Sequence, residues 1–174
     1  MRPIRATFTL IALAGLAACS NPDRFGPEGA GVGPGAGFGG SAGVASGPLD
    51  PSSPAYFQES IGDRVLFAVD QSTLSPEARQ VLAEQARWLV QNPEYTAIIE
   101  GHADEQGTRE YNLALGARRA ASAQDFLVSQ GVAPGRLRTV TYGKERPEEI
   151  CSTESCYTQN RRAVTVVAAS GLIG

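Results

Sequence analysis

Residues 99–120 have the sequence IEGHADEQGTREYNLALGARRA, in which a strand, a polar turn and a helix follow one another. The strand ends at Glu100, the turn contains Gly107, and the helix begins at about Thr108. Loops that lead from a strand into a helix often bind polar ligands, because free backbone N–H groups point outward there. We therefore expect a binding site in this stretch.

Four residues of this helix recur at helical spacing and share one face, namely Thr108, Asn112, Leu115 and Arg119. The face begins beside Asp104. A carboxylate binds an ammonium group, and an arginine grips a carboxylate with two parallel hydrogen bonds. An acid and an arginine across a small gap therefore suit a ligand that carries both charges.

A structural role for the same two residues is the alternative. In that interpretation Asp104 caps the helix, and Arg119 pairs on the surface with Glu110 or Asp125. The residues of the stretch alone do not decide between the two.

The pattern of apolar and polar residues outside this stretch predicts the rest of the fold. Ser75, Pro76 and Glu77 are typical of a helix start, Asn92-Pro93 of a helix stop, and Trp88 is expected in the core. The order β-α-β-α-β-β predicts an α+β two-layer sandwich with the helices on one face of a mixed sheet. The expected strands are 65–69, 96–100, 137–142 and 163–168, and the expected helices begin at Ser75 and Thr108 and end at Asn92 and Gln130.

Composition argues against several functions. The net charge is -3, and Lys144 is the only lysine, so nothing favours binding to nucleic acid. His102 is the only histidine. A hydrolase that uses His102 with Asp104 or Glu105 is an alternative, but no nucleophile accompanies these residues, so we expect no enzyme activity and no cofactor or metal.

The first residues have the pattern of an export signal. Arg2 and Arg5 precede the apolar stretch Ala6–Ala14, which is too short to span a bilayer. Leu16-Ala17-Ala18-Cys19 follows and resembles the lipobox of bacterial lipoproteins, in which the cysteine receives lipid. We expect residues 1–18 to be a signal peptide and Cys19 to be the lipid anchor; a secretory signal with a chance cysteine is the alternative.

Residues 19–55 are expected to form a tether. They are rich in glycine and proline and contain too few apolar residues to offset the entropy of the chain. A random coil of about 33 residues has an r.m.s. span on the order of 30 Å. Residues 56–174 are then the folded domain.

The stretch quoted first resembles the signature of OmpA-like peptidoglycan-binding domains, and in particular the peptidoglycan-associated lipoproteins of Tol-Pal systems. Further matches are Leu66-Phe67-Ala68-Val69-Asp70, Tyr142-Gly143-Lys144-Glu145-Arg146-Pro147 and Asn160-Arg161-Arg162-Ala163-Val164. The resemblance runs from about Asp63 to Val167. It covers essentially the whole domain, and the lipobox and tether fit it.

This resemblance implies a ligand and a site. The ligand is the peptide stem of peptidoglycan, centred on the zwitterionic end of meso-diaminopimelate. Asp104 and Arg119 fall on the family's key acid and arginine, Asp70 and its neighbour Ser72 complete the pocket, and Asn112 and Leu115 line its helix side.

The resemblance also implies partners and a location. The lipid holds the protein on the outer membrane. An Asp directly after the lipid-carrying cysteine favours the inner membrane, and this chain has Ser20 at that position. The domain faces the periplasm and binds peptidoglycan, TolB and other Tol-Pal components, and it helps the outer membrane follow constriction at cell division. A related lipoprotein that only anchors the envelope is the alternative.

The chain departs from the family in two places. The family commonly has the sequence Asp-Glu-Arg-Gly at the positions of residues 104–107, whereas this chain has Gln106 in place of the arginine. This difference predicts weaker binding of the ligand or a different chemistry of the peptide stem. Cys151 and Cys156 are not general in the family. Two loop cysteines so close together in an oxidising compartment usually form a disulfide, and a metal site is the alternative.

Overall fold

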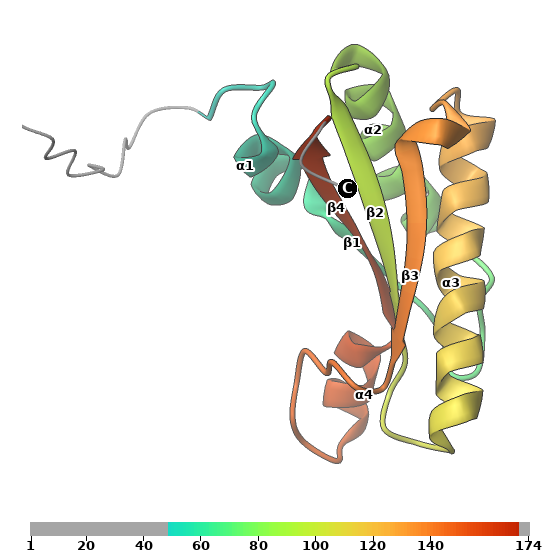
Figure 1. Ribbon diagram of the computed structural model, residues 1–174. Coiled ribbons are helices and arrows are strands. Elements are labelled where there is room, and N and C mark those ends of the chain that lie inside the picture. Colours follow the sequence, from blue (N-terminus) through green and yellow to red (C-terminus); the bar gives the residue numbers. More distant parts are fainter. Residues whose placement is uncertain (1–48, 171–174) are drawn as a thin grey trace, which may run out of the picture. The chain divides into compact units, whose positions relative to one another are not determined.

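The computed structural model describes residues 49–170 (Figure 1). The expected signal peptide, the lipid-carrying Cys19 and most of the expected tether lie outside the described residues and stay predictions. In the described part of the chain no helix is both long and apolar enough to cross a membrane.

Four strands and four α-helices make up the domain. A π-helix, Phe57–Gly62, continues the first helix, and a 3-10 turn, Pro134–Arg136, precedes the third strand. The strands are β1 (Arg64–Leu66), β2 (Tyr95–His102), β3 (Leu137–Gly143) and β4 (Arg162–Ala169), and the helices are α1 (Pro54–Tyr56), α2 (Pro76–Gln91), α3 (Arg109–Ser129) and α4 (Glu154–Asn160).

The four strands form one mixed sheet in the order β1-β4-β2-β3. Strand β4 is antiparallel to both β1 and β2, whereas β3 is parallel to β2. Figure 1 shows α2 and α3 together on one face of this sheet, and both pack against its strands. The predicted α+β two-layer sandwich with a mixed sheet is confirmed.

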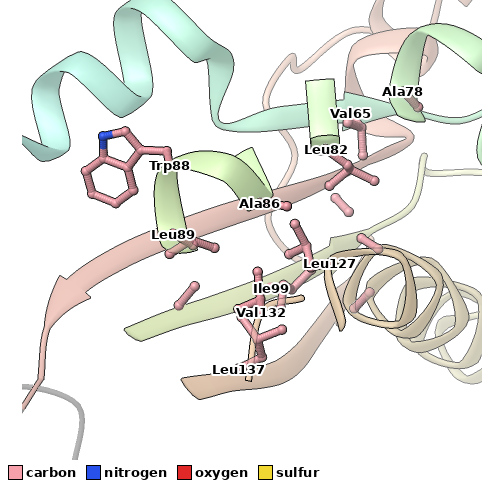
Figure 2. Packing of buried hydrophobic residues seen from close by; sticks show 14 of the residues in the cluster. Val65, Ala78, Leu82, Ala86, Trp88, Leu89, Ile99, Leu127, Val132 and Leu137 are labelled. Carbon is pink, nitrogen blue, oxygen red and sulfur yellow. The ribbon is translucent and has the colours of Figure 1, made fainter. Parts of the chain in front are cut away.

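The core lies between the sheet and these two helices (Figure 2). Leu82 and Leu89 of α2, Leu127 of α3 and Ile99 of β2 are fully buried there. Trp88 closes one end of this layer, as expected from the sequence: its ring is buried, and its indole N–H donates to the carbonyl of Pro51 over 2.7 Å.

The helix that follows the binding loop packs unusually close to the sheet. Gly116 of α3 lies directly over Gly101 of β2, and a methyl group added to Gly101 would overlap the carbonyl oxygen of Gly116. Only the absence of both side chains permits this approach. It fixes where the first turns of α3 lie relative to the end of β2.

The structure differs from the predicted elements at three places. Strand β1 ends at Leu66 rather than Val69, because its partner strand β4 begins at Arg162, opposite Leu66; the chain then turns at Asp70, whose φ is 57°. Helix α1 includes residues 54–56, so the folded part begins inside the segment assigned to the tether, and Ser53 caps this helix. Helix α4 was not predicted and interrupts the segment between β3 and β4.

Candidate functional site

A pocket of about 280 Å³ opens where β2 passes into α3. The loop after β1 forms its other wall, so segments far apart in the sequence meet there. It is lined by Val69, Asp70, Asp104, Gln106, Gly107, Tyr111, Asn112 and Leu115. The structure therefore brings together four of the six predicted binding residues, Asp70, Asp104, Asn112 and Leu115.

The loop from Asp104 to Gly107 has a defined conformation. The amide of Gln106 donates to Asp104 Oδ1 over 3.2 Å, and Gly107 has a φ of 89°, which a residue with a side chain rarely adopts. Asn112 Nδ2 donates to the carbonyl of Gln106 over 2.7 Å. Thr108 then caps α3 by accepting a hydrogen bond from the amide of Tyr111.

Asp104 is nearly buried, with 9% of its surface exposed, and it pairs with an arginine that follows it by 57 residues in the sequence. Arg161 Nη1 donates to Asp104 Oδ2 over 3.2 Å, and Arg161 Nη2 donates to Glu154 over 2.5 Å. Burial lowers the pKa of Arg161, but its hydrogen bonds with Glu154 and Asp104 together raise the pKa by more than burial lowers it. The pKa of Arg161 is therefore raised overall. The Asp104 carboxylate is thus held at both oxygens, by the amide of Gln106 at Oδ1 and by Arg161 at Oδ2.

Arg119 lies behind the pocket rather than in its lining. Its side chain is fully buried, and it donates to the carbonyls of Gln71 and His102, each over 2.8 Å, and of Ala68 over 3.2 Å. This excludes the surface pairing considered above for Arg119. Burial lowers its pKa to about 10, partly offset by the charge of Asp104, so the guanidinium stays charged at neutral pH.

The two residues expected from the loop after β1 are separated. Asp70 is exposed at the rim of the pocket, and the hydroxyl of Tyr111 donates to its Oδ1. Ser72 instead lines a separate, shallow depression with Arg79, Ser122 and others. The structure therefore does not bring Ser72 into the pocket with Asp104.

Known proteins resemble this chain in sequence and in fold. The model of the OmpA family matches residues 66–162, which is more than half of the chain. The peptidoglycan-associated lipoprotein of Mesorhizobium japonicum is 56% identical over 126 residues, covering 72% of this chain and 75% of that protein. The one from Agrobacterium fabrum is 48% identical, covering 93% of this chain and 86% of that protein.

The chain belongs to the OmpA family. The crystal structure of the peptidoglycan-associated lipoprotein from Burkholderia pseudomallei matches with a TM-score of 0.63 and 33% identity, covering 67% of this chain and 100% of that chain. That chain corresponds to the folded domain alone, so such a domain folds without a tether. The C-terminal domain of Helicobacter pylori MotB shares the fold, with a TM-score of 0.58 and 17% identity.

His102 is a structural residue in this OmpA-family domain. Its ring is 2% exposed, neither ring nitrogen has a hydrogen-bond partner, and the ring packs on Tyr142 with 5.5 Å between centroids. Burial, followed by the charge of Arg162, lowers its pKa to about 4. Among residues 49–170 no three potential ligand side chains gather as a metal site, so the hypothesis of a metal clip at the cysteines has no support there.

Two residues of this site were missed from the sequence. Arg161 had no predicted role in the site, and its partner Asp104 is 57 residues away in the sequence. Tyr111 faces Asp70 across 41 residues. The family motif Asn160-Arg161-Arg162 was the one available indication for Arg161, whereas no pattern in the sequence indicated Tyr111.

Proposed function

We propose that this chain is an outer-membrane lipoprotein whose domain binds the peptide stem of peptidoglycan without cutting it. The zwitterionic end of meso-diaminopimelate is the ligand. One observation carries the proposal: the pocket has the carboxylates of Asp70 and Asp104 in its wall and the charged Arg119 directly behind it. The names of the peptidoglycan-associated lipoproteins described above support peptidoglycan as the polymer that is bound.

The pocket offers separate places for the two charges of such a ligand. The ammonium group binds Asp104, whose carboxylate has one charged partner, Arg161. The ligand carboxylate lies toward the start of α3, where the first backbone N–H groups are free of helical partners. Arg119, buried behind the pocket, adds positive charge to the site and has three of its five N–H donors engaged with backbone carbonyls.

Binding without hydrolysis follows from the state of the acids and the histidine. His102 is buried with a pKa near 4, and its ring does not line the pocket. Asp104 is engaged by Arg161 and by the amide of Gln106. A general base must reach the proton that it removes, and His102 does not reach the ligand.

The proposal includes the attachment and the partners of the domain. Lipid on Cys19 holds the chain on the outer membrane, and two or more acyl chains give stable anchoring. The domain joins that membrane to the wall and, with TolB and the other Tol-Pal components, draws the membrane inward at division. A pull-down tests the Tol-Pal part: TolB is added to the immobilised domain, and the eluate is analysed for TolB. If TolB is absent from the eluate under conditions in which a known pair is captured, the Tol-Pal part is wrong.

Sedimentation with purified sacculi tests the ligand. We expect the wild-type domain, residues 49–174, to sediment with the sacculi and Asp104→Asn to remain in the supernatant. Asp104→Asn keeps the shape of the side chain and removes its charge. Glu110→Gln, which changes an exposed acid in the first turn of α3, is the control and should sediment like wild type. Equal sedimentation of all three proteins, or release of muropeptides by the wild type, contradicts the proposal.

A further inference from the structure

Helix α4 lies at the same end of the domain as the loop between β2 and α3 (Figure 1). It has seven residues and is mostly exposed, with Cys156 and Asn160 buried. A helix this short is not stable alone and must be held by contacts outside itself. The structure supplies a covalent contact at one end and a buried polar contact at the other.

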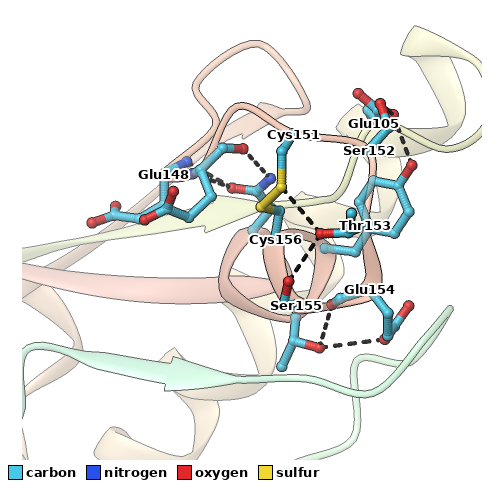
Figure 3. The surroundings of a disulfide bond; sticks show 12 residues. Glu105, Glu148, Cys151, Ser152, Thr153, Glu154, Ser155 and Cys156 are labelled. Carbon is cyan, nitrogen blue, oxygen red and sulfur yellow. Dashed lines mark hydrogen bonds between the residues drawn. A yellow bond between two sulfur atoms is a disulfide. The ribbon is translucent and has the colours of Figure 1, made fainter.

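The covalent contact is the disulfide between Cys151 and Cys156 (Figure 3). It joins the segment before α4 to the first turn of the helix, with 5.9 Å between the two Cα atoms. At the far end Asn160 accepts hydrogen bonds from the amides of Glu148 and Glu149 over 2.7 and 3.0 Å. These contacts fix α4 relative to the end of β3.

The same segment contacts the pocket loop through Glu105, the residue next to Asp104. The hydroxyl of Ser152, inside the disulfide ring, donates to Glu105 Oε1 over 2.7 Å. The hydroxyl of Tyr157, one residue after Cys156, donates to the same oxygen over 2.8 Å. Figure 3 shows Glu105 above the disulfide with Ser152 beside it. The two hydrogen bonds, that of Ser152 first, lower the pKa of Glu105, so this acceptor is ionised at neutral pH.

Two further contacts tie the loop to its surroundings. Arg161, directly after α4, links Glu154 of that helix to Asp104. On the other side Lys144 Nζ donates to the carbonyl of Gly107 over 2.7 Å and to that of Glu105 over 3.3 Å. Asp104 is therefore positioned from α4 both directly, through Arg161, and through its neighbour Glu105.

We propose that the Cys151–Cys156 disulfide positions the binding pocket: it holds Ser152 and Tyr157 against Glu105 and thereby keeps Asp104 in the geometry that receives the ligand. Asp104 is the residue that touches the ligand, and the disulfide, Ser152, Tyr157 and Glu105 act through it. The identity of the ligand rests on the function proposed above, whereas the coupling between disulfide and loop does not. An oxidising periplasm keeps the disulfide formed.

The first test compares oxidised and reduced protein. The affinity of residues 49–174 for a stem peptide ending in meso-diaminopimelate is measured before and after dithiothreitol, which supplies the two electrons and two protons that give two thiols. We expect reduction to weaken binding about tenfold, because the carboxylate of Asp104 then loses the contacts that hold it in position for the ligand. The variant with Cys151→Ser and Cys156→Ser should bind like reduced wild type and should not respond to dithiothreitol. Equal affinities in all states overturn the proposal.

Side-chain variants separate positioning from general stability. Both Tyr157→Phe and Glu105→Ala leave the disulfide intact. Tyr157→Phe removes one of the two hydrogen bonds to Glu105, and Glu105→Ala removes both. Each variant should weaken binding several-fold with little change in the urea midpoint. Glu105→Gln keeps an oxygen acceptor at this position and should restore most of the affinity. Reduced protein that binds weakly while Tyr157→Phe and Glu105→Ala bind normally contradicts the positioning role, because the disulfide then acts through stability alone.

Hydrogen exchange of the backbone amides of residues 105–107 provides a readout without ligand. We expect faster exchange there after reduction and in Glu105→Ala, and no change in the core amides of Ile99 and Leu127. Faster loop exchange in a domain that fails to bind the stem peptide supports the coupling and refutes the proposed ligand. Unchanged loop exchange on reduction refutes the coupling, whatever the peptide does.

Discussion

Arg119 and Asp104 have different roles although the sequence places them together as one charge pair. Asp104 is at the pocket wall, whereas Arg119 is buried behind it and joins two backbone segments, the loop after β1 through the carbonyls of Ala68 and Gln71 and the end of β2 through that of His102. The residue pattern predicted both charges in one site, whereas only Asp104 lines the pocket. It did not predict that the arginine also holds the pocket together, because backbone carbonyl partners leave no trace in a sequence.

Arg119→Ala should therefore destabilise the domain as well as abolish binding. Three carbonyls lose their donor, the buried one of His102 among them, and leaving a buried acceptor unsatisfied costs about 1–3 kcal/mol of unfolding free energy. Urea unfolding measures this loss. Arg118→Ala, which changes the exposed neighbour on the same helix, is the matched control and should leave the midpoint unchanged. If Arg119→Ala and Arg118→Ala have the same midpoint, the structural role is wrong.

His102 makes the domain sensitive to mild acid. Its pKa falls from 6.5 to about 4 on folding, because the ring is buried and lies near the charge of Arg162. The unfolded chain therefore binds a proton between these two pH values and the folded domain does not. The contribution of His102 to stability is complete above pH 6.5 and is lost as the pH falls toward 4, by about 3 kcal/mol in total.

This pH dependence can be assigned by comparing variants. We expect the unfolding free energy of wild type to fall more steeply between pH 6.5 and 4 than that of His102→Gln, whose side chain does not titrate. Urea titrations at several pH values give both slopes. The carboxylates titrate in both proteins, so the difference between the slopes reports His102. Parallel slopes would show that His102 binds its proton equally well in both states.

At the scale of the elements, the contact between β2 and α3 positions the pocket. A methyl group on Gly116 would lie 2.5 Å from Thr141 Oγ1 and 2.8 Å from the carbonyl oxygen of Gly101. Gly116→Ala should therefore force α3 away from the sheet and cost about 1–3 kcal/mol, as overpacking in a core does. Thermal unfolding followed by circular dichroism measures the loss. Gly135→Ala, where nothing lies within 4 Å, should have the wild-type midpoint, and equal midpoints for both variants would contradict the close approach.

The elements that the sequence predicted well are those with an apolar stripe or a cap. Helix α2 begins after its Ser75 cap, and Leu82 and Leu89, which lie two helical turns apart on its inner face, are buried. Helix α4 had neither kind of indication: it is short, its first residues are exposed, and the side chain of its cap residue, Thr153, accepts no hydrogen bond from a backbone amide of the helix. Its position depends on a disulfide and on Asn160, contacts that a periodic pattern does not contain.

At the scale of the whole molecule, the fold was predictable and one part of the site was not. The order of strands and helices was enough for the α+β sandwich, and the polar loop before Thr108 was enough to locate the pocket. Ser72 was expected in this pocket and lies in a separate depression, since the turn at Asp70 directs the following residues elsewhere. Arg161 was missed because it reaches Asp104 only after β4 has paired with β1 and β2.

Calorimetry of the domain with defined stem peptides tests the central claim, that the pocket binds a group carrying both an ammonium and a carboxylate. A stem ending in meso-diaminopimelate should give saturable binding, and a lysine stem, which lacks the second carboxylate, should bind at least tenfold more weakly. Asp104→Asn should lose the stronger binding, since removing one partner of a desolvated charge pair typically costs about 2–5 kcal/mol. Equal affinity for the two stems, or no heat from either with correctly folded wild type, would contradict the account.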